Sequence, residues 1–282
     1  MCCSLRVRWR DRPQAAAGGT LGMEKRTPFA ITLAVWKALF LREALGRMFS
    51  SRGAWFWLFA EPAFHVAYLM VLFGVIRVST VGGIEKVVWI LVGLLAFFAF
   101  RRTADQVINA LSANRALYTY RQVKPADTVL VRGFLEAFLL AITAAIVLAG
   151  AALIGYDVVP TDPLSVLEAF FGLWLVGLGV GLIVSVVADM VPELGRIFRL
   201  MMMPMYLLSG VMFPISVVPQ PYRDWLLLNP VAHGLEAARL GFASNYHAVP
   251  GLSIPYLYGF ALVSMFIGLL LHRRFASRLV SQ

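Results

Sequence analysis

Long apolar stretches alternate with short polar ones along most of this chain. A helix that crosses the hydrocarbon core of a bilayer needs about 20 mainly apolar residues. Six windows of the sequence meet this requirement: 55–76, 87–110, 128–154, 164–188, 197–213 and 254–272. The pattern therefore predicts an all-α integral membrane protein with six transmembrane helices.

A helical pattern also precedes the first window, in residues 29–52. Five apolar residues there fall within an arc of about 100° around the helix axis: Ala38, Leu41, Leu45, Met48 and Phe49. Three charged residues fall outside that arc: Arg42, Glu43 and Arg47. We therefore expect an N-terminal amphipathic helix that lies on the cytoplasmic membrane surface and leads into the first span.

Residues 1–28 differ from the rest because they contain arginines but no periodic apolar pattern. Such a segment cannot bury enough apolar surface to offset the entropy of ordering it. We expect a disordered N-terminal extension, with binding of its basic side chains to acidic lipid as the alternative. Residues 29–282 then form a single membrane domain, since the six windows leave no room for a second folded one.

Basic residues are distributed unequally between the two sides of the predicted bundle. Of the 25 lysines and arginines, 21 lie on the side of the N-terminus, and only Arg77, Lys86, Arg223 and Arg239 lie on the other. The positive-inside rule therefore places both termini in the cytoplasm. The same asymmetry accounts for the net charge of +10, so no nucleic acid partner is needed to explain it.

The connection between the fifth and sixth windows, residues 212–242, is too apolar for an open loop. It contains four prolines, which remove backbone donors and disfavour helix just before them: Pro214, Pro219, Pro221 and Pro230. We predict a periplasmic re-entrant helical element. Asn229 and Pro230 mark a turn, after which a short helix carries Glu236 and Arg239 as a pair spaced i,i+3 on one face.

The same connection carries a family resemblance. A Gly-x-x-aromatic-Pro run is followed by Trp-Leu-Leu-Leu-Asn-Pro-x-x-His-x-x-Glu-x-x-Arg. The matching residues are Gly210, Phe213, Pro214, Trp225, Asn229, Pro230, His233, Glu236 and Arg239. This pattern resembles the membrane subunit of type-2 ABC exporters, and among them the permeases that export capsular polysaccharide. The resemblance extends roughly over residues 29–274, and we assign its residues from Pro214 onward to a periplasmic gate.

The resemblance implies partners. A family member is a half-transporter that pairs with a second copy of itself and is driven by two ATPase subunits. Residues 112–127 form the longest inner connection, and their motif resembles the coupling helix that docks on the ATPase: Arg121, Val123, Lys124, Pro125 and Asp127. We expect Pro125 to end any helix there and Asp127 to cap the next one. Glu193, in residues 190–199, is a second candidate for docking. Ordinary positive-inside residues are the alternative.

A substrate path is predicted from two arginines and several aromatic residues. The apolar run 87–100 spans about 21 Å, less than a hydrocarbon core of about 30 Å, so Arg101 or Arg102 begins below the inner interface. Asp105 lies at the right spacing to pair with Arg101, whereas Arg102 has no partner at that spacing. Arg102 either snorkels to the headgroups or faces the path and attracts an anionic substrate.

Aromatic residues of the first window offer a second contribution to that path. Trp55, Trp57 and Tyr68 could form a surface along which sugar rings slide. The alternative is an aromatic belt at the membrane interface.

Other chemistry is missing from the sequence. No Gly-x-x-x-x-Gly-Lys-Ser/Thr motif occurs, so a partner ATPase must bind ATP and magnesium, and we expect this chain to bind no cofactor. The four histidines show no ligand or catalytic spacing, and we expect neither a catalytic nor a metal site. An ion-coupled transporter would place acids near the bilayer midplane. Most acids lie near window ends instead, among them Glu61, Asp105, Glu136 and Glu168.

These observations predict a non-enzymatic permease subunit. We expect it to move lipid-linked capsular polysaccharide from the cytoplasm across the bacterial inner membrane, with a periplasmic export protein as a further candidate partner. An exporter of O-antigen or teichoic acid is the close alternative, and an ion-coupled secondary transporter is the distant one.

Overall fold

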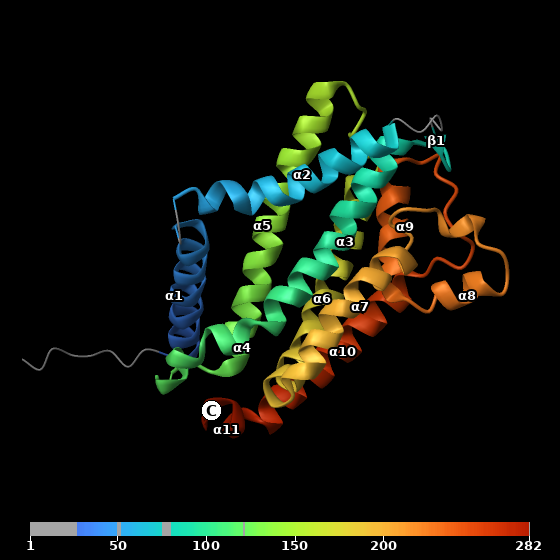
Figure 1. The fold of residues 1–282 in the computed structure, drawn as a ribbon. Helices are drawn as coiled ribbons and strands as arrows, with labels where there is room; N and C mark the ends of the chain where they lie inside the picture. The colour runs from blue at the N-terminus through green and yellow to red at the C-terminus, as the bar shows by residue number, and fades with distance from the viewer. Residues whose placement is uncertain (1–26, 50–51, 75–79, 121, 282) are drawn as a thin grey trace, which may run out of the picture.

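The computed structural model describes residues 27–49, 52–74, 80–120 and 122–281. The long helices are α1 (Pro28–Phe49), α2 (Ala54–Gly74), α3 (Lys86–Ile108), α5 (Pro125–Ile154), α6 (Pro163–Met190), α7 (Pro192–Leu208) and α10 (Ile254–Arg274). The shorter elements are β1 (Thr80–Val81), β2 (Ile84–Glu85), α4 (Ala110–Ala113), η1 (Arg115–Thr119), η2 (Ile215–Val217), α8 (Tyr222–Leu226), α9 (Pro230–Phe242) and α11 (Ala276–Ser281). Figure 1 shows their arrangement.

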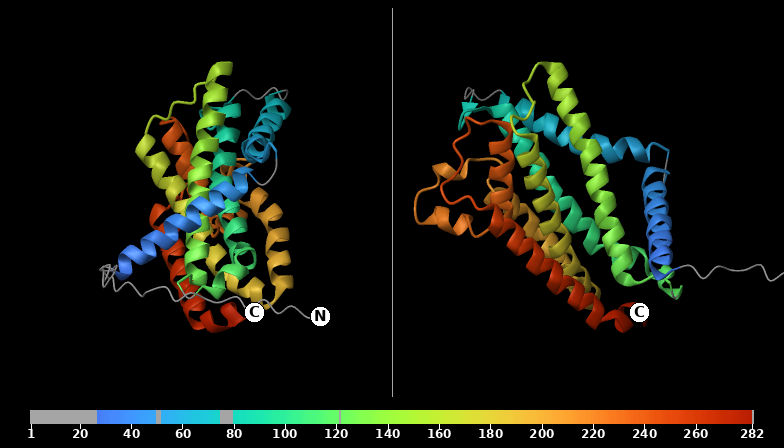
Figure 2. Two further views of the ribbon diagram at one scale, coloured as in Figure 1. Left: turned by 90° about the vertical axis from the view of Figure 1, so that its left-hand side faces the viewer. Right: turned by 180° about the vertical axis from the view of Figure 1, so that it is seen from behind.

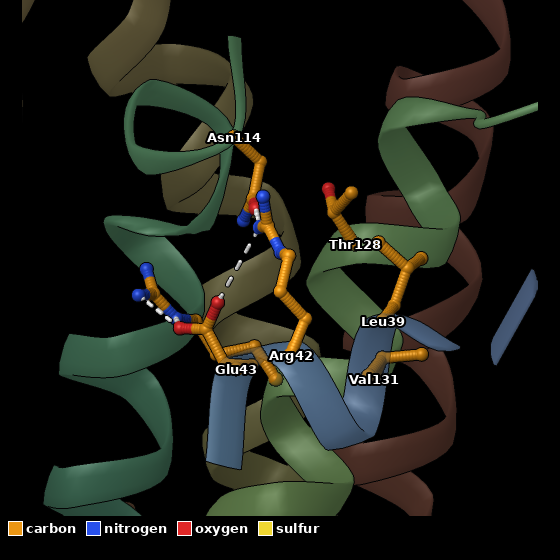
Figure 3. Close-up of a pocket in the computed structure, with 7 residues that line it drawn as sticks. Leu39, Arg42, Glu43, Asn114, Thr128 and Val131 are labelled. Carbon is orange, nitrogen blue, oxygen red and sulfur yellow. Dashed lines mark hydrogen bonds and ion pairs between the residues drawn. The ribbon is translucent and has the colours of Figure 1, made fainter. Parts of the chain in front are cut away.

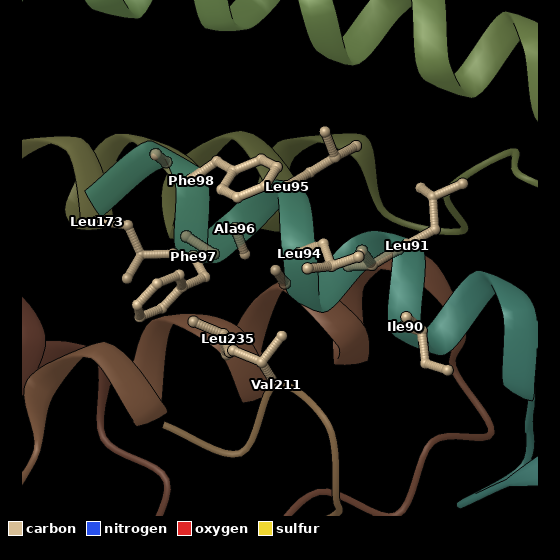
Figure 4. Packing of buried hydrophobic residues seen from close by; sticks show 14 of the residues in the cluster. Ile90, Leu91, Leu94, Leu95, Ala96, Phe97, Phe98, Leu173, Val211 and Leu235 are labelled. Atoms are coloured by element: carbon tan, nitrogen blue, oxygen red, sulfur yellow. The ribbon is translucent and has the colours of Figure 1, made fainter. Parts of the chain in front are cut away.

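Helix α3 is the centre of the bundle. All of its residues from Val87 to Phe100 are buried, as expected for a helix that is apolar on every face. It packs against α5, α6 and α9. Figure 4 shows side chains of α3 between Leu173 of α6, Leu235 of α9 and Val211, which follows α7.

Within the described residues, four helices are long and apolar enough to cross a membrane: α3, α5, α6 and α10. They coincide with four of the predicted windows. The apolar window of α3 is 89% buried inside the chain, whereas those of α5 and α10 are only 28% and 22% buried. The exposed apolar faces of α5 and α10 are therefore available to lipid or to another chain.

Helices α2 and α7 occupy the positions of the first and fifth predicted windows. The fifth window was placed wrongly, because α7 covers Pro192–Leu208 rather than 197–213. Pro192 takes the first helical position, where its missing N–H is harmless. Gly210 ends the segment with φ +73, a left-handed conformation that favours glycine. Proline and glycine chemistry, rather than hydropathy, sets both ends.

The prediction of a purely α-helical chain missed a two-stranded hairpin. β1 and β2 pair antiparallel, with Thr80 opposite Glu85 and Val81 opposite Ile84. The two residues between them, Gly82 and Gly83, both have positive φ, +57 and +94. A two-residue turn of this kind needs that conformation at both positions, and the Gly-Gly pair was the sequence signal for it.

The N-terminal helices lie on one side of the bundle. Figure 2 shows α1 crossing α5 obliquely and α2 leading from the far end of α1 toward the hairpin. Helix α1 packs on α5 through two aromatic pairs, Trp36 with Phe134 at 6.0 Å between ring centroids and Phe40 with Phe138 at 6.2 Å. Helix α2 contacts α1, α3 and α5.

One end of the bundle is formed by α4, η1 and α11, which gather where the chain ends (Figure 1). Helix α11 contacts both η1 and α5. Its Leu279 is buried in a cluster with Tyr118 of η1 and Val129 of α5. The C-terminal segment therefore supports the connection between α3 and α5 from below.

Candidate functional site

An open cleft of about 1370 Å³ lies between α2 and α3. It brings together four of the five residues predicted for the substrate path: Trp57, Tyr68, Arg101 and Arg102. The fifth, Trp55, lies in α2, but its side chain is outside the described residues. The cleft has an aromatic wall from α2, where Trp57 and Tyr68 are 68% and 57% exposed, and a charged floor from α3.

Each arginine of the cleft floor lies near one carboxylate, at a distance longer than a hydrogen bond. Arg101 Nε lies 3.7 Å from Asp105 Oδ2, the i,i+4 pair that the sequence predicted. Arg102 Nε lies 3.6 Å from Glu136 Oε2. The sequence offered no partner for Arg102 at helical spacing, and the structure brings one from α5, which sequence spacing could not find.

Glu136 is a buried carboxylate, 1% exposed, and it also joins the cleft to α1. Arg47 Nη1 of α1 contacts Glu136 Oε1, and Arg47 Nη2 donates to Gln106 Oε1 at 3.0 Å. One turn away, Arg132 Nε of α5 donates to Glu43 Oε1 of α1 at 2.6 Å. A carboxylate out of contact with water needs such counter-charges.

These contacts modify the interpretation of α1 as an amphipathic helix. Its apolar arc is exposed, with Leu41, Leu45 and Phe49 at 49%, 54% and 69%, as an interfacial helix requires. Glu43 and Arg47, however, face α5 rather than water or headgroups. The sequence pattern identified the apolar arc but not the protein surface that receives the charged residues.

A small pocket lies where α1 meets the start of α5 and the connection between α3 and α5 (Figure 3). Arg42 of α1 donates to the side chain of Asn114, which is 3% exposed and itself donates to Ala110 O at 2.9 Å. Glu43 lies in the same pocket and contacts both Arg42 and Arg132. Helix α1 is therefore tied by side-chain bonds to the connection between α3 and α5.

The predicted coupling motif surrounds the start of α5. Pro125 is the first residue of α5. It therefore begins a helix and also marks the end of the connection before it. Asp127 accepts from the backbone N–H of Lys124 at 3.3 Å and from Trp36 Nε1 of α1 at 3.0 Å. The prediction that Asp127 is the cap residue is corrected: Lys124 is the cap residue, and Asp127 lies in the first turn of α5, from which its carboxylate reaches back to the N–H of Lys124. Val123 is half-buried and Lys124 is exposed, while Arg121 lies outside the described residues.

The second candidate docking segment adjoins the first. Glu193 is exposed in the first turn of α7. Just before it, Asp189 of α6 accepts from Arg115 Nη2 of η1 at 2.8 Å. The ion pair links the predicted docking segment 112–127 to the α6–α7 corner, so the two predicted docking segments lie on one surface at this end of the bundle.

At the other half of α3, the predicted pair of Glu236 and Arg239 is buried on α9. Arg239 Nη1 lies 3.1 Å from Glu236 Oε1, and the two side chains are 0% and 1% exposed. Arg239 also donates to Gly210 O at 2.9 Å, Val211 O at 3.1 Å and Trp89 O at 3.4 Å. Its guanidinium lies 3.5 Å from the centroid of the Trp89 ring. One arginine thus joins three segments.

Tyr246 completes this buried network from the loop after α9. Its hydroxyl donates to Glu236 Oε2 at 2.9 Å, and Trp89 Nε1 donates to the same hydroxyl at 3.3 Å. Burial raises the pKa of Tyr246 to about 12, so the hydroxyl keeps its proton and remains a donor. Neither Tyr246 nor Trp89 was predicted to take part, because Trp89 is distant along the chain and Tyr246 lies in the loop beyond the helix that carries Glu236.

The remaining predicted gate residues shape the approach to α9. Asn229 Oδ1 accepts from the N–H of Val231 at 3.0 Å, which caps the helix, and Pro230 takes its first position. His233 Nδ1 accepts from Ser253 N at 3.1 Å, so its Nε2, 2.8 Å from Leu227 O, is the donor. Pro214 precedes η2, and Trp225 is 67% exposed.

The arrangement of long apolar helices in a bundle agrees with a comparison to known families. A model of the ABC-2 type transporter family matches residues 34–243. The chain belongs to the ABC-2 type transporter family. Within its described residues, this ABC-2 transporter chain has four helices that are long and apolar enough to span a bilayer, and it is a membrane protein.

Individual relatives of this ABC-2 transporter chain align over nearly their full length. It is 33% identical over 248 residues to the polysialic acid transport protein KpsM of Escherichia coli, covering 88% of this chain and 96% of KpsM. It is 27% identical to the capsule polysaccharide export inner-membrane protein CtrC of Neisseria meningitidis over 256 residues, 89% and 96% of the two chains. For BexB of Haemophilus influenzae, another capsule polysaccharide export inner-membrane protein, the identity is 26% over 253 residues, 90% and 95%.

Proposed function

We propose that this chain is the membrane permease of an ATP-driven exporter, and that it moves lipid-linked capsular polysaccharide from the cytoplasm across the bacterial inner membrane. The observation that carries the proposal is the α2–α3 cleft, in which an aromatic wall faces two arginines. Aromatic faces contact sugar rings without fixing their register. Guanidinium groups bind carboxylate and phosphate in a bidentate manner, which suits an acidic glycan or a phosphate-linked lipid.

The proposed assembly is a homodimer with two ATPase subunits. In a single chain the cleft is open, as the exposure of Trp57, Phe64 and Tyr68 indicates, and a second copy placed against it would close it into a path. In this arrangement α2 and α7 span the membrane together with α3, α5, α6 and α10, and the distribution of basic residues supports a cytoplasmic location for both termini. The ATP and magnesium are bound by the partner subunits.

The inner surface formed by η1, Val123, Lys124, Pro125, Asp127 and Glu193 is the proposed ATPase contact. Its segments are linked by Arg115–Asp189 at 2.8 Å and by Trp36–Asp127 at 3.0 Å. A surface bound together in this way can move as a unit, so ATP-driven closure of the partners would be transmitted to α1, α5 and α6 together.

On the periplasmic side we assign α8 and α9 to a re-entrant gate. Every residue of α9 except Leu240 is buried, and Arg239 joins it to α3 and to the segment after α7. Trp225, exposed on α8, lies on the outer surface of this element. Because α9 is tightly anchored and α8 is exposed, these contacts support a gate in which α8 moves and α9 stays fixed.

The test combines genetics with purification. Deletion of the gene that encodes this chain should abolish surface polysaccharide and leave glycan in the cytoplasm. A tagged form of the chain should copurify with an ATPase. Analysis of the retained glycan separates capsule from O-antigen or teichoic acid. Normal surface glycan in the deletion strain would refute the proposal. Export that stops when an uncoupler collapses the proton gradient while ATP is maintained would favour an ion-driven transporter.

Orientation is tested separately by labelling from outside the cell. In a background in which Cys2 and Cys3 are replaced by serine, a cysteine at Gln220 should react with a membrane-impermeant thiol reagent, and one at Gln122 should not. Both positions lie in exposed connections, so failure to react reports sidedness rather than burial. The opposite labelling pattern would contradict the assigned orientation.

A further inference from the structure

Glu136 of α5 lies between two arginines that come from different parts of the molecule. Arg47 belongs to the peripheral helix α1, and Arg102 belongs to α3 and lines the cleft. The carboxylate is 1% exposed, whereas Arg102 is 23% exposed. One buried negative charge is therefore shared between a side chain that meets the cleft and a side chain that does not line it.

The two arginines hold Glu136 unequally. Arg47 contacts Oε1 directly. Arg102 Nε lies 3.6 Å from Oε2, which is longer than the 2.7–3.2 Å of a hydrogen bond, and Oε2 has no hydrogen-bond partner among the described residues. Arg102 is attracted to Glu136 without being fixed by it. Its guanidinium can turn toward another anion in the cleft, and Glu136 would keep Arg47 as a counter-ion.

Helix α1 continues this link to the inner surface. Beyond Arg47, Glu43 pairs with Arg132, and Arg42 donates to Asn114 of the α3–α5 connection. Trp36 donates to Asp127 at the start of α5. These three contacts, like the pair of Arg47 and Glu136, hold α1 against α5 or the connection before it. A change in how strongly Glu136 holds Arg47 therefore acts on the same helix that touches the proposed ATPase contact.

We propose that Glu136 is an internal counter-ion that an incoming phosphate or carboxylate group displaces from Arg102, and that this exchange tightens α1 against α5. Occupancy of the cleft is thereby reported to the coupling surface. The proposal rests on the proposed function, because it assigns regulation to the same cleft. Linkage is reciprocal, so a change that weakens the hold of Arg47 on Glu136 must also change the affinity of the cleft for anions.

The first test follows α1 directly in the permease–ATPase complex in phosphatidylcholine nanodiscs. A fluorophore is attached to Gly46→Cys on α1, where an added Cβ meets no atom within 4 Å, and the control is Gly259→Cys on α10, where an added Cβ is equally free of contacts. Cys2 and Cys3 are replaced by serine. The probes are lysophosphatidylglycerol, its zwitterionic counterpart lysophosphatidylcholine, and inorganic phosphate.

Lysophosphatidylglycerol should change the fluorescence of the label at residue 46 but not of the label at residue 259. Lysophosphatidylcholine should change the fluorescence of neither label. A matching response to inorganic phosphate would support a site for free anions, whereas a response only to the anionic lipid would support a site for a lipid-borne phosphate. Equal responses to both lipids, or no response to any probe, would overturn the proposal. Because glycan export is not measured, these outcomes are independent of whether the export assignment fails.

Three variants give the second test, through the sign of their effect on lysophosphatidylglycerol affinity. Arg102→Gln removes the ligand group and should weaken binding about tenfold, the effect of one charge-assisted contact. Glu136→Gln removes the competitor and should tighten binding about tenfold. Arg47→Gln leaves Glu136 wholly to Arg102 and should weaken binding, although Arg47 does not line the cleft.

The opposite signs separate exchange from simple loss of packing. If Glu136 and Arg47 served only to dock α1, Glu136→Gln and Arg47→Gln would change anion affinity in the same direction. Shifts in the same direction would overturn the proposal. Should Glu136→Gln fail to fold, weaker binding by Arg47→Gln with loss of the response at residue 46 would still support it, and wild-type binding in that variant would refute it.

Discussion

Arginines beside the two halves of α3 are held in opposite ways. Arg239, next to the first half, is fully buried and bonded to one carboxylate and three backbone carbonyls, with an indole ring against its face. Arg101 and Arg102, in the second half, are 45% and 23% exposed and lie 3.7 and 3.6 Å from single carboxylates. The same side chain is a structural joint in one place and an available cation in the other.

The difference lies in the number of partners rather than in the charge. Each hydrogen bond to a charged group contributes about 1.5–3 kcal/mol. A guanidinium that makes several short hydrogen bonds would lose too much free energy if it exchanged them for contacts with a ligand. A guanidinium with one distant partner can make this exchange. The comparison predicts that the stability of the protein depends on Arg239 and that transport depends on Arg101 and Arg102.

The largest effect on stability is expected from Arg239→Gln. The substitution leaves Glu236 buried without its counter-charge, which costs about 3–5 kcal/mol. Thermal unfolding of the purified protein in detergent should show a large decrease in the unfolding temperature. Arg223→Gln is the matched control, because Arg223 also donates to backbone carbonyls, Val218 O and Ser216 O, but from a half-exposed position. Equal losses in the two variants would remove the distinction between a buried joint and a surface contact.

A smaller loss is expected from Gly93→Ala on α3. A Cβ at this position would collide with the guanidinium of Arg239, and such overpacking costs about 1–3 kcal/mol. Gly259→Ala is the control, since nothing lies within 4 Å of an added Cβ there. Unfolding of both variants is compared with wild type. Unchanged stability in Gly93→Ala would mean that Arg239 is not held as tightly as its contacts imply.

Loss of the cap of α9 should have a still smaller effect. Asn229→Ala removes the side-chain acceptor for Val231 N and the donor to Ser209 Oγ at 2.8 Å, and loss of a helix cap costs about 1 kcal/mol. Gln220→Ala, which removes an exposed contact with Asp224, should change nothing measurable. If the two variants unfold alike, α9 is anchored by Arg239 alone.

Much of the fold could be predicted because spanning helices depend on local hydropathy. The windows matched by α3, α5, α6 and α10 were of this kind. The ends of α7 and the hairpin were missed because they depend on single prolines and glycines, which hydropathy does not weigh. Pro192, Gly210 and the pair Gly82–Gly83 carried those signals.

The sites were predictable only where both partners share a helix. Arg101 with Asp105 and Glu236 with Arg239 follow from i,i+4 and i,i+3 spacing. Glu136, Tyr246 and Asn114 were missed as partners because they reach their sites from other segments. A charged residue within an apolar window, such as Glu136, was the available signal that a counter-charge had to exist elsewhere.

The most direct test of the account is Arg102→Gln, measured for stability, assembly and export together. Because Glu136 keeps Arg47 as its counter-charge, loss of the 3.6 Å contact with the partly exposed Arg102 should change the free energy of unfolding by no more than about 1 kcal/mol. The ATPase should still copurify. Export of surface polysaccharide should be lost, with Arg102→Lys intermediate because it keeps the charge without the planar fork. Wild-type export by Arg102→Gln would contradict the assignment of the inner arginines to transport.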